Sequence, residues 1–164
     1  MFSDANKPKA AAPAISREAA LSSALGRLSW PDLDLRWATL VDYDGFLMAS
    51  YPPEAEFDPS QAAAATAHIL IGGERARQEI NLGKWRFTLM VGSEMQHLAV
   101  AINKECVLAI GMGPMAPLGK AMNAIRKIIP DLARDLDLTS RKYTEENTIL
   151  WRPGDLRPKD LKPK

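Results

Sequence analysis

The sequence predicts an α+β domain in which helices cover one five-stranded antiparallel sheet. Three observations indicate this class. Two short segments with alternating apolar and polar residues are joined by a tight turn, and three more strand-like segments follow one another later in the chain. Helical periodicity appears before, between and after these strands. Strands joined by such short turns must be antiparallel, and helices with an apolar stripe must bury it against the sheet.

The length of 164 residues suits one domain with a tail at each end. The segment 1–15 is rich in Ala, Lys and Pro without periodicity, which predicts a disordered tail. The segment 139–164 contains three prolines and carries seven Lys or Arg against four acidic residues, a net charge of +3. Its apolar cluster, TILW at 148–151, either docks on the domain or a partner, or stays solvated. We therefore expect the folded domain at 16–138.

Composition excludes several classes of function. The net charge of +1 provides no field that would favour nucleic acid or an anionic membrane. No apolar run approaches the roughly 20 residues that span a bilayer, and the N-terminus lacks the apolar core of a signal peptide. Cys106, the single cysteine, cannot form an intrachain disulfide and lies in an apolar run. We expect a cytoplasmic protein with no membrane insertion and no nucleic-acid partner.

The first helix is expected at 17–28, capped by Ser16, because Leu21, Leu25 and Leu28 repeat at helical spacing. A strand then runs from Leu33 to Val41 with a period of two. The turn DYDG follows, with Asp42 at its first position, Asp44 within it, and Gly45 where a positive φ is needed. The chain returns as a strand over 46–50, which Pro52 and Pro53 end.

The second helix has the clearest start signal in the chain. Asp58 is the expected N-cap and Pro59 the first helical residue, and the helix continues to Ile80 before Asn81 and Gly83 close it. Small residues mark it, with four alanines at 62–65 and a glycine pair at 72–73 in mid-helix. Each of these glycines costs about 1 kcal/mol relative to Ala, so they need an explanation.

Three strands are expected at 84–91, 94–102 and 105–112, and the last is apolar throughout, as a central strand should be. In the first of them, Trp85, Phe87, Leu89 and Val91 should share one face. The last helix is expected at 118–136, with one apolar stripe and with Pro130 kinking or splitting it.

The glycine-rich connection IGMGPMAPLGKAM at 110–122 resembles a nucleotide-binding loop at first reading. The phosphate-loop pattern fails, because Pro114 stands where its first glycine should be and Ala121 where its hydroxyl should be. The dinucleotide pattern matches at 111–116, but no parallel strand follows the helix. We interpret the glycines as a sharp exit from a central strand and expect no cofactor.

Other catalytic signals are weak. His68 and His97 have no His, Cys or carboxylate at metal-ligand spacing, and no segment resembles a nucleophile elbow. We therefore expect no metal, no catalytic residue and no enzyme activity.

The segment WATLVDYDGFLMAS at 37–50 resembles the roadblock family, the small domains related to dynein light chains and to bacterial regulators of Ras-like GTPases. The shared signature is a strand, Val-Asp-x-Asp-Gly at 41–45, and a second strand ending in Ala49-Ser50. The order of elements over about 16–136 agrees as well. The resemblance implies the strand order 2-1-5-4-3, with the second helix alone on one face of the sheet.

The resemblance also implies a homodimer in which second helices pack together and third strands pair edge to edge. On the helix and the strand, the expected interface residues are Ala62, Ala65, Ile69, Gly72, Gly73, Ala76, Trp85 and Phe87. The small residues would then allow two helix backbones to approach closely. From the residues alone, the alternative is that this small-residue face packs on the protein's own sheet.

Three functional hypotheses follow. The first is a non-enzymatic adaptor or regulator dimer that binds a Ras-like small GTPase, with an activating or anchoring role. An arginine in trans is one device for accelerating GTP hydrolysis, and Arg75, Arg77 and Arg86 are candidates, with a solvated face as the alternative for each. The second is a structural scaffold without a GTPase partner, whose tails carry recognition. The third is a small-molecule or nucleotide sensor that uses the loop at 111–120.

Overall fold

The computed structural model describes residues 16–28, 30–53, 56–103 and 106–136, so both predicted tails lie outside the described residues. The elements, in order, are α1 (Arg17–Leu25), a 3-10 turn η1 (Pro31–Leu33), β1 (Leu35–Asp42), β2 (Leu47–Tyr51), α2 (Pro59–Glu79), β3 (Phe87–Val91), β4 (Gln96–Ala101), β5 (Cys106–Met112) and α3 (Leu118–Leu136). The side chain of Ser16 caps α1, as predicted.

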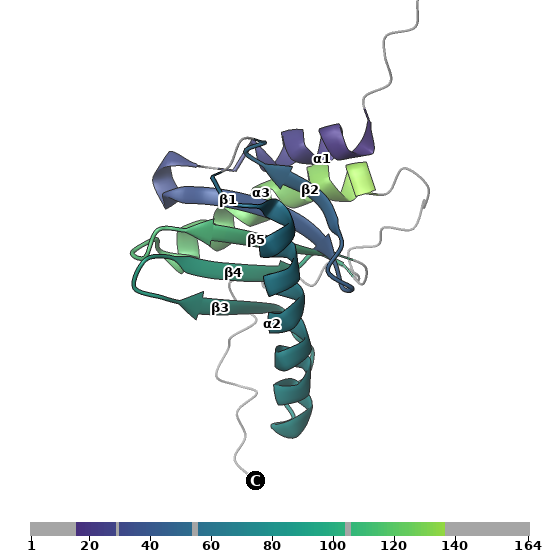
Figure 1. Ribbon diagram of the computed structural model, residues 1–164, viewed down its shortest axis with the longest axis vertical. Coiled ribbons are helices and arrows are strands. Elements are labelled where there is room, and N and C mark those ends of the chain that lie inside the picture. Colours follow the sequence, from purple (N-terminus) through teal and green to yellow (C-terminus); the bar gives the residue numbers. More distant parts are fainter. Residues whose placement is uncertain (1–15, 29, 54–55, 104–105, 137–164) are drawn as a thin grey trace, which may run out of the picture.

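The five strands form one antiparallel sheet in the order β2-β1-β5-β4-β3. Figure 1 shows α2 crossing one face of the sheet by itself, with α1 and α3 together on the opposite face. The α+β class and the strand order implied by the resemblance are therefore confirmed.

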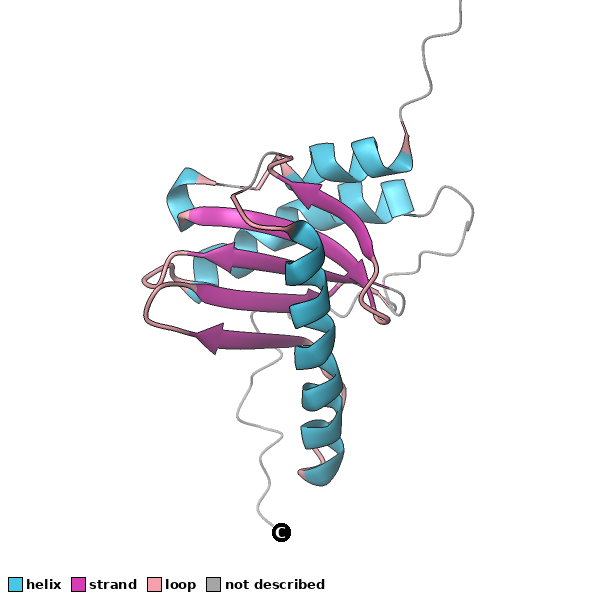
Figure 2. Cartoon of the chain, in the orientation of Figure 1, coloured by secondary structure: helices cyan, strands magenta, loops and turns pink. Residues whose placement is uncertain are grey.

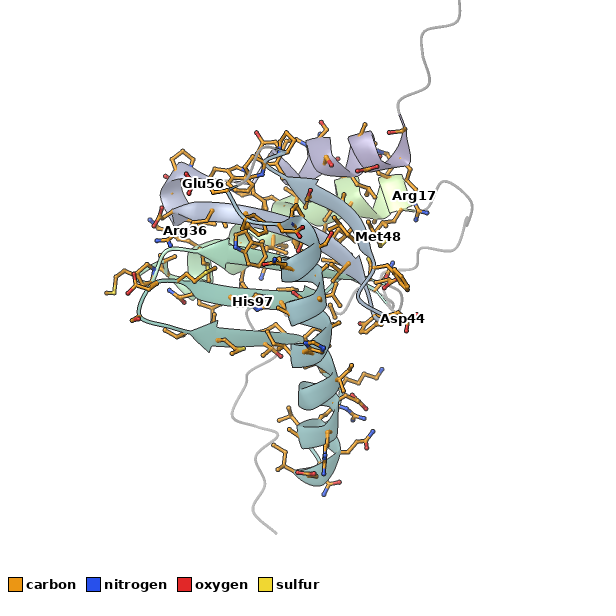
Figure 3. The ribbon with its side chains drawn as sticks, viewed as in Figure 1. Arg17, Arg36, Asp44, Met48, Glu56 and His97 are labelled. Carbon is orange, nitrogen blue, oxygen red and sulfur yellow. The ribbon has the colours of Figure 1, made fainter. Side chains whose placement is uncertain are left out.

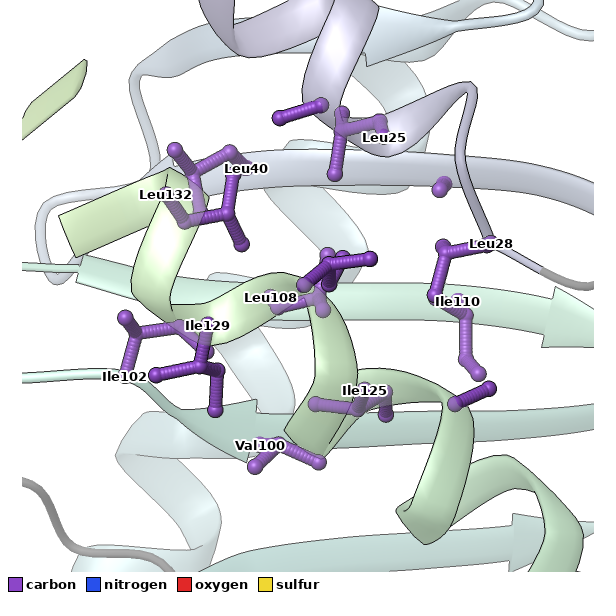
Figure 4. Packing of buried hydrophobic residues seen from close by; sticks show 14 of the residues in the cluster. Leu25, Leu28, Leu40, Val100, Ile102, Leu108, Ile110, Ile125, Ile129 and Leu132 are labelled. Atoms are coloured by element: carbon purple, nitrogen blue, oxygen red, sulfur yellow. The ribbon is translucent and has the colours of Figure 1, made fainter. Parts of the chain in front are cut away.

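The main core lies between the sheet and the pair α1 and α3 (Figure 4). Strand β5 is buried along its whole length because it is central and helices cover both faces. Large aliphatic side chains fill this side, among them Leu40, Leu108, Ile125 and Leu132. The side under α2 is thinner and is built from smaller residues, such as Ala63 and Ala99. Small side chains here allow α2 to lie close to the strands.

The start of β1 differs from the sequence prediction. Leu33 ends the 3-10 turn that Pro31 begins, and Asp34 then adopts a left-handed conformation with a φ of 45°. The strand therefore starts at Leu35 and not at Leu33. The carbonyl of Asp34 accepts a hydrogen bond of 2.9 Å from the amide of Gly113, which ties this bend to the exit of β5.

Strand β3 is shorter than predicted, because pairing with β4 begins at Phe87. As a result Trp85 and Leu89 do not share a face. Trp85 packs with Leu70 on the α2 side of the sheet, whereas Leu89 packs into the main core on the other side. The period of two applies only within the paired strand, and Trp85 precedes it.

Pro130 does not split the last helix, since α3 is continuous from Leu118 to Leu136. Pro130 is exposed, and Ile129 and Leu132 on either side of it are buried against the core. Burial of the apolar stripe stabilises both halves of the helix, and this packing outweighs the single donor that proline removes.

Candidate interaction surface

Helix α2 lies on the sheet for only part of its length (Figure 2). Its buried residues all lie between Ala62 and Leu70: Ala62, Ala63, Thr66, Ala67 and Leu70. The part of the helix after Leu70 runs past β3, the last strand of the sheet, and contains no buried residue. The helix is well bounded at both ends, by the Asp58 carboxylate that accepts from the amide of Ser60 and by the left-handed Asn81. A rigid helical arm therefore extends beyond the sheet edge.

Most of the expected helix interface residues lie along one flank of this arm. Ala65, Gly72 and Ala76 are exposed, while Ile69 and Gly73 are half-buried. Spacings of three and four residues place them on one side of the helix. A Cβ on Gly73 would come within 4.0 Å of Thr88 Oγ1, which puts this flank next to β3, and a Cβ on Gly72 would meet no atom within 4 Å.

Ala62 differs from the other expected interface residues. Its exposure is 7 %, and it packs against Trp37 and Ala109 of the chain's own sheet. Because α2 still lies over the sheet at this point, Ala62 is not available to a partner, contrary to the sequence prediction. Ala62, Ala63 and Ala67 pack on the chain's own sheet, as the alternative interpretation expected, whereas Ala65 is exposed.

The edge of the sheet beside the arm is strand β3. Within the described chain β3 pairs with β4 alone, so its outer edge bears no strand. Phe87 is 36 % exposed and Val91 is 67 % exposed, while Trp85 is half-buried. An unpaired edge with apolar side chains is a template for pairing with another strand.

Four exposed apolar residues in this region were missed from the sequence: Ile80, Leu82, Met90 and Val91. Ile80 and Leu82 flank the left-handed Asn81 at the tip of the arm and are each more than 60 % exposed. The sequence does contain a sign of this exposure, because Ile80 and Leu82 stand on either side of the turn that ends the helix. Recognising that they have no sheet to pack on requires the position of the sheet edge, which the sequence does not provide.

The arginines considered for phosphoryl transfer are engaged locally. Arg75 pairs with Glu79 at 3.2 Å, and Arg77 pairs with Glu74 at 2.6 Å and donates to the carbonyl of Gly83 at 2.9 Å. Hydrogen bonds from Arg77 and then from Gln78 lower the pKa of Glu74 to about 2. Arg86 is exposed and also has interactions of its own. These contacts stabilise the end of α2 and its return toward β3.

The glycines after β5 are explained by packing. A Cβ on Gly111 would collide with the indole ring of Trp37, and a Cβ on Gly113 would collide with the carboxylate of Asp34. Trp37 is the large side chain of the α2 face, where it contacts Phe57 with ring centroids 5.1 Å apart. The Gly-x-Gly pattern therefore makes room for Trp37 and for the bend at Asp34.

The polar groups of the same loop face the wrong way for a phosphate cradle. The buried side chain of Gln96 donates from Nε2 to three carbonyls, those of Gly113, Pro114 and Ala116, at 2.9–3.1 Å. A phosphate site requires converging amides, whereas here carbonyl oxygens converge and the amides of Gly113 and Ala116 bond to backbone carbonyls. The loop is a Gln96-centred connection between β5 and α3.

The turn at 42–46 has the conformation that its residues predict. The Asp42 Oδ1 atom accepts from the amides of Asp44 and Phe46 at 3.0 and 2.8 Å, and Gly45 has a φ of 89°. Gly45 also lies against Ala67, since a Cβ built on it would come within 2.8 Å of the Ala67 Cβ. The β1–β2 turn is thereby fixed against α2, and Figure 3 shows Asp44 at its tip.

His97 is half-buried and forms a polar contact with α2; Figure 3 labels its position. Its Nε2 lies 3.1 Å from Thr66 Oγ1, which donates to the carbonyl of Ala62, so Nε2 is the protonated nitrogen. The Nδ1 atom is buried without a hydrogen-bond partner. Burial lowers the pKa of His97, because a charged imidazolium would lose its hydration beside Trp37.

We expect His97 to make the protein less stable in mild acid. A lowered folded-state pKa means that the unfolded chain binds the proton first, so the free energy of unfolding falls as the pH drops below about 6.5. Urea titrations should show that the free energy of unfolding falls less between pH 7.5 and pH 5.5 in His97→Gln than in the wild type. The matched control is His68→Gln, an exposed position on α2, which should retain the wild-type fall; equal falls in both variants would contradict this account.

Two kinds of site are absent from the described residues. Among these residues, no group of three or more His, Cys, Asp or Glu is arranged to hold a metal ion. No helix in the described part of the chain is both long and apolar enough to cross a membrane.

Solved structures with the same fold include two MglB proteins and a Roadblock/LC7 domain. MglB of Myxococcus xanthus has a TM-score of 0.61 at 17% identity and covers 78% of this chain and 92% of that one. The gliding protein MglB of Thermus thermophilus has a TM-score of 0.61 at 18% identity, covering 76% and 97%. The Roadblock/LC7 domain of Streptomyces avermitilis has a TM-score of 0.58 at 15% identity, covering 73% and 96%.

No protein-family model matches the sequence, and no curated protein matches it. The similarity to the solved structures is one of fold, and this chain has the roadblock fold.

Proposed function

We propose that this chain is a non-enzymatic adaptor that forms a homodimer and binds a Ras-like small GTPase as its regulator or anchor. The observation that carries the proposal is the exposed arm of α2 beside the unpaired edge of β3. The fold it shares with MglB and with a Roadblock/LC7 domain supports the same assignment.

A two-fold partner accounts for both exposed features at once. Antiparallel pairing of β3 with its copy satisfies the free edge and continues the sheet into the second protomer. The arm of α2 then lies over the partner's half of that sheet, and its small flank at Gly72, Gly73 and Ala76 allows two helices to approach closely. Ile80, Leu82 and Val91 become buried in this arrangement, which removes apolar surface from water.

The GTPase is proposed from the roadblock resemblance and from the chemistry of the surface. The described residues present small and apolar side chains on α2 and β3, and Arg75 and Arg77 are held in ion pairs with neighbouring glutamates. A protein of this kind acts by positioning the switch residues of the GTPase. A dimer also offers two equivalent surfaces, or one composite surface across its two-fold axis.

A pull-down with two nucleotide states tests the GTPase. The immobilised full chain would be offered the Ras-like GTPase encoded nearest to its own gene, loaded either with a non-hydrolysable GTP analogue or with GDP. We expect a preference of about tenfold for one state, because switch segments differ in order between the two states. A parallel hydrolysis assay would separate an activating role from an anchoring role.

The other hypotheses predict different results. Equal or absent binding in both nucleotide states, with the dimer intact, would favour a scaffold without a GTPase partner. A rise in melting temperature with ATP, GTP or NAD added to the chain alone would favour a nucleotide sensor. The carbonyls that converge on Gln96 argue against the nucleotide sensor, because they would repel a phosphate in this loop.

A further inference from the structure

A groove lies between the β1–β2 turn, the second half of α2 and the segment that returns from α2 to β3. Its volume is about 410 Å³, and its lining residues are Tyr43, Leu70, Glu74, Arg77, Lys84 and Trp85. Leu70, Glu74 and Arg77 follow one another at helical spacing, so one side of α2 forms one wall. This side is distinct from the flank that carries Gly72 and Ala76. We call this feature the hairpin groove.

The hairpin groove is preformed and largely apolar. Its turn wall is fixed because Gly45 packs on Ala67 and because the Tyr43 hydroxyl donates to the carbonyl of Asn103 at 3.1 Å. Exposed apolar side chains extend the surface beyond the groove: Phe46 is 70 % exposed and Ile71, one turn after Ala67 on α2, is 66 % exposed. An apolar surface of this kind on a rigid frame is suited to a short apolar segment.

The charges in the hairpin groove leave one cation uncompensated. Glu74 is neutralised by its bidentate contacts with Arg77, at 2.6 and 2.7 Å. Lys84, by contrast, has no ion pair or hydrogen bond with any part of the chain that the structure describes. On the opposite wall Tyr43 is followed by Asp44, which is exposed at the tip of the turn. A complementary ligand is therefore an apolar segment with an acidic group toward Lys84 and a basic group toward Asp44.

The chain contains a segment with this pattern, beyond the end of α3. Glu145 and Glu146 are followed closely by Ile149, Leu150 and Trp151, and Arg152 comes next. The order acid, apolar, base matches the charges of the groove. The volume of about 410 Å³ is adequate for one large aromatic side chain with an aliphatic neighbour.

The length of chain after α3 is sufficient for this segment to reach the groove. The guanidinium of Arg17 donates to the carbonyl of Leu136 at 3.1 Å, so α3 ends beside Arg17, and Figure 3 shows Arg17 and Asp44 toward the same side of the molecule. Ile149 is thirteen residues after Leu136, which allows an extended reach of about 43 Å at ~3.3 Å per residue. A domain of this size has a radius of gyration of about 14 Å, so the groove lies within reach.

We propose that residues 145–152 of the C-terminal segment bind in the hairpin groove of the same chain, with Ile149 to Trp151 on Leu70 and Trp85 and with the two glutamates toward Lys84. The segment then covers the side of α2 opposite to the flank proposed for dimerisation. It acts as a built-in competitor for any apolar, acidic peptide that uses the same groove. The inference does not depend on a GTPase partner, because its test uses this chain alone.

Hydrogen exchange in the full chain tests the proposal. The backbone amides of 146–151 should exchange about tenfold more slowly than in a synthetic peptide spanning 143–154, because docking removes them from water. Lys84→Glu should raise their exchange rate by about fivefold, and Lys84→Glu combined with Glu145→Lys and Glu146→Lys should restore the protection. Trp151→Ala should abolish it, while leaving exchange in β5 and α3 unchanged.

The control is Lys120→Glu, which makes the same charge change at an exposed position on α3, across the sheet from the groove. It should leave exchange at 146–151 as in the wild type. Exchange in the full chain equal to that of the free peptide would overturn the proposal, as would protection that survives Lys84→Glu undiminished. Protection that disappears on dilution would place the segment on a second copy and would overturn its placement in the same chain.

Discussion

Replacing Gly111 by Ala should lower the free energy of unfolding by about 3 kcal/mol, because the new methyl group has no space. It would overlap the indole ring of Trp37 and lie 2.7 Å from Met95 Cε. The methionine can move, but the indole is confined between Phe57, His97 and the first half of α2. Moving the indole would therefore displace α2 from the sheet.

Gly119→Ala is the matched control in the same glycine-rich connection. A Cβ on Gly119 meets nothing within 4 Å, and the residue lies in the first turn of α3. Alanine there should leave stability unchanged or raise it by up to about 1 kcal/mol. Urea unfolding at one protein concentration measures both variants, and a Gly111→Ala protein as stable as the wild type would contradict the packing account.

The second large effect is expected from Gly72→Leu, which should weaken the proposed homodimer about 100-fold, equivalent to about 2.7 kcal/mol. Gly72 is exposed in the described chain, and a Cβ there meets no atom of the same chain within 4 Å. Leucine is also the better helix former by roughly 0.8 kcal/mol, so the isolated fold should not be harmed. A loss of association therefore reports a helix that approaches closely from a second copy.

Ala64→Leu provides the control for this experiment. Ala64 is exposed on the same helix, eight residues before Gly72, so leucine there adds similar bulk about 80° around the helix axis and about 12 Å along it from the proposed close approach. Sedimentation equilibrium should give the wild-type dimer constant for Ala64→Leu and a much weaker one for Gly72→Leu. If Ala64→Leu dissociates the dimer and Gly72→Leu does not, the interface lies nearer the start of α2 than Gly72.

Local sequence signals predicted the elements well where one residue type determines the backbone. Ser16 and Asp58 cap their helices, Gly45 has the positive φ that its turn requires, and Asn81 ends α2 in a left-handed conformation. Strand boundaries were predicted less well. Leu33 is in a 3-10 turn and Trp85 precedes its strand, because pairing partners decide where a strand begins.

The candidate surface was only partly predictable for a related reason. Exposure of a residue on α2 depends on whether the sheet lies beneath it, and this changes after Leu70. Ala62 and Ala76 look equivalent as small helical residues, yet Ala62 is buried on the sheet and Ala76 is exposed on the arm. For the same reason the sequence did not predict that Ile80 and Leu82 are exposed, because their environment depends on the position of the edge strand β3.

The sequence by itself determined the order of the elements, the turn chemistry at 42–45 and the absence of a phosphate-loop pattern at 110–122. These features depend on backbone conformation and spacing within a few residues. Tertiary structure alone decided which residues of α2 are exposed and why Gly111 and Gly113 are needed after β5. Position 111 must be glycine because the indole of Trp37, 74 positions earlier in the chain, occupies the space of a Cβ. Gly72 is exposed because α2 extends beyond the edge of its sheet. Both facts depend on distances between elements, which local residue patterns do not encode.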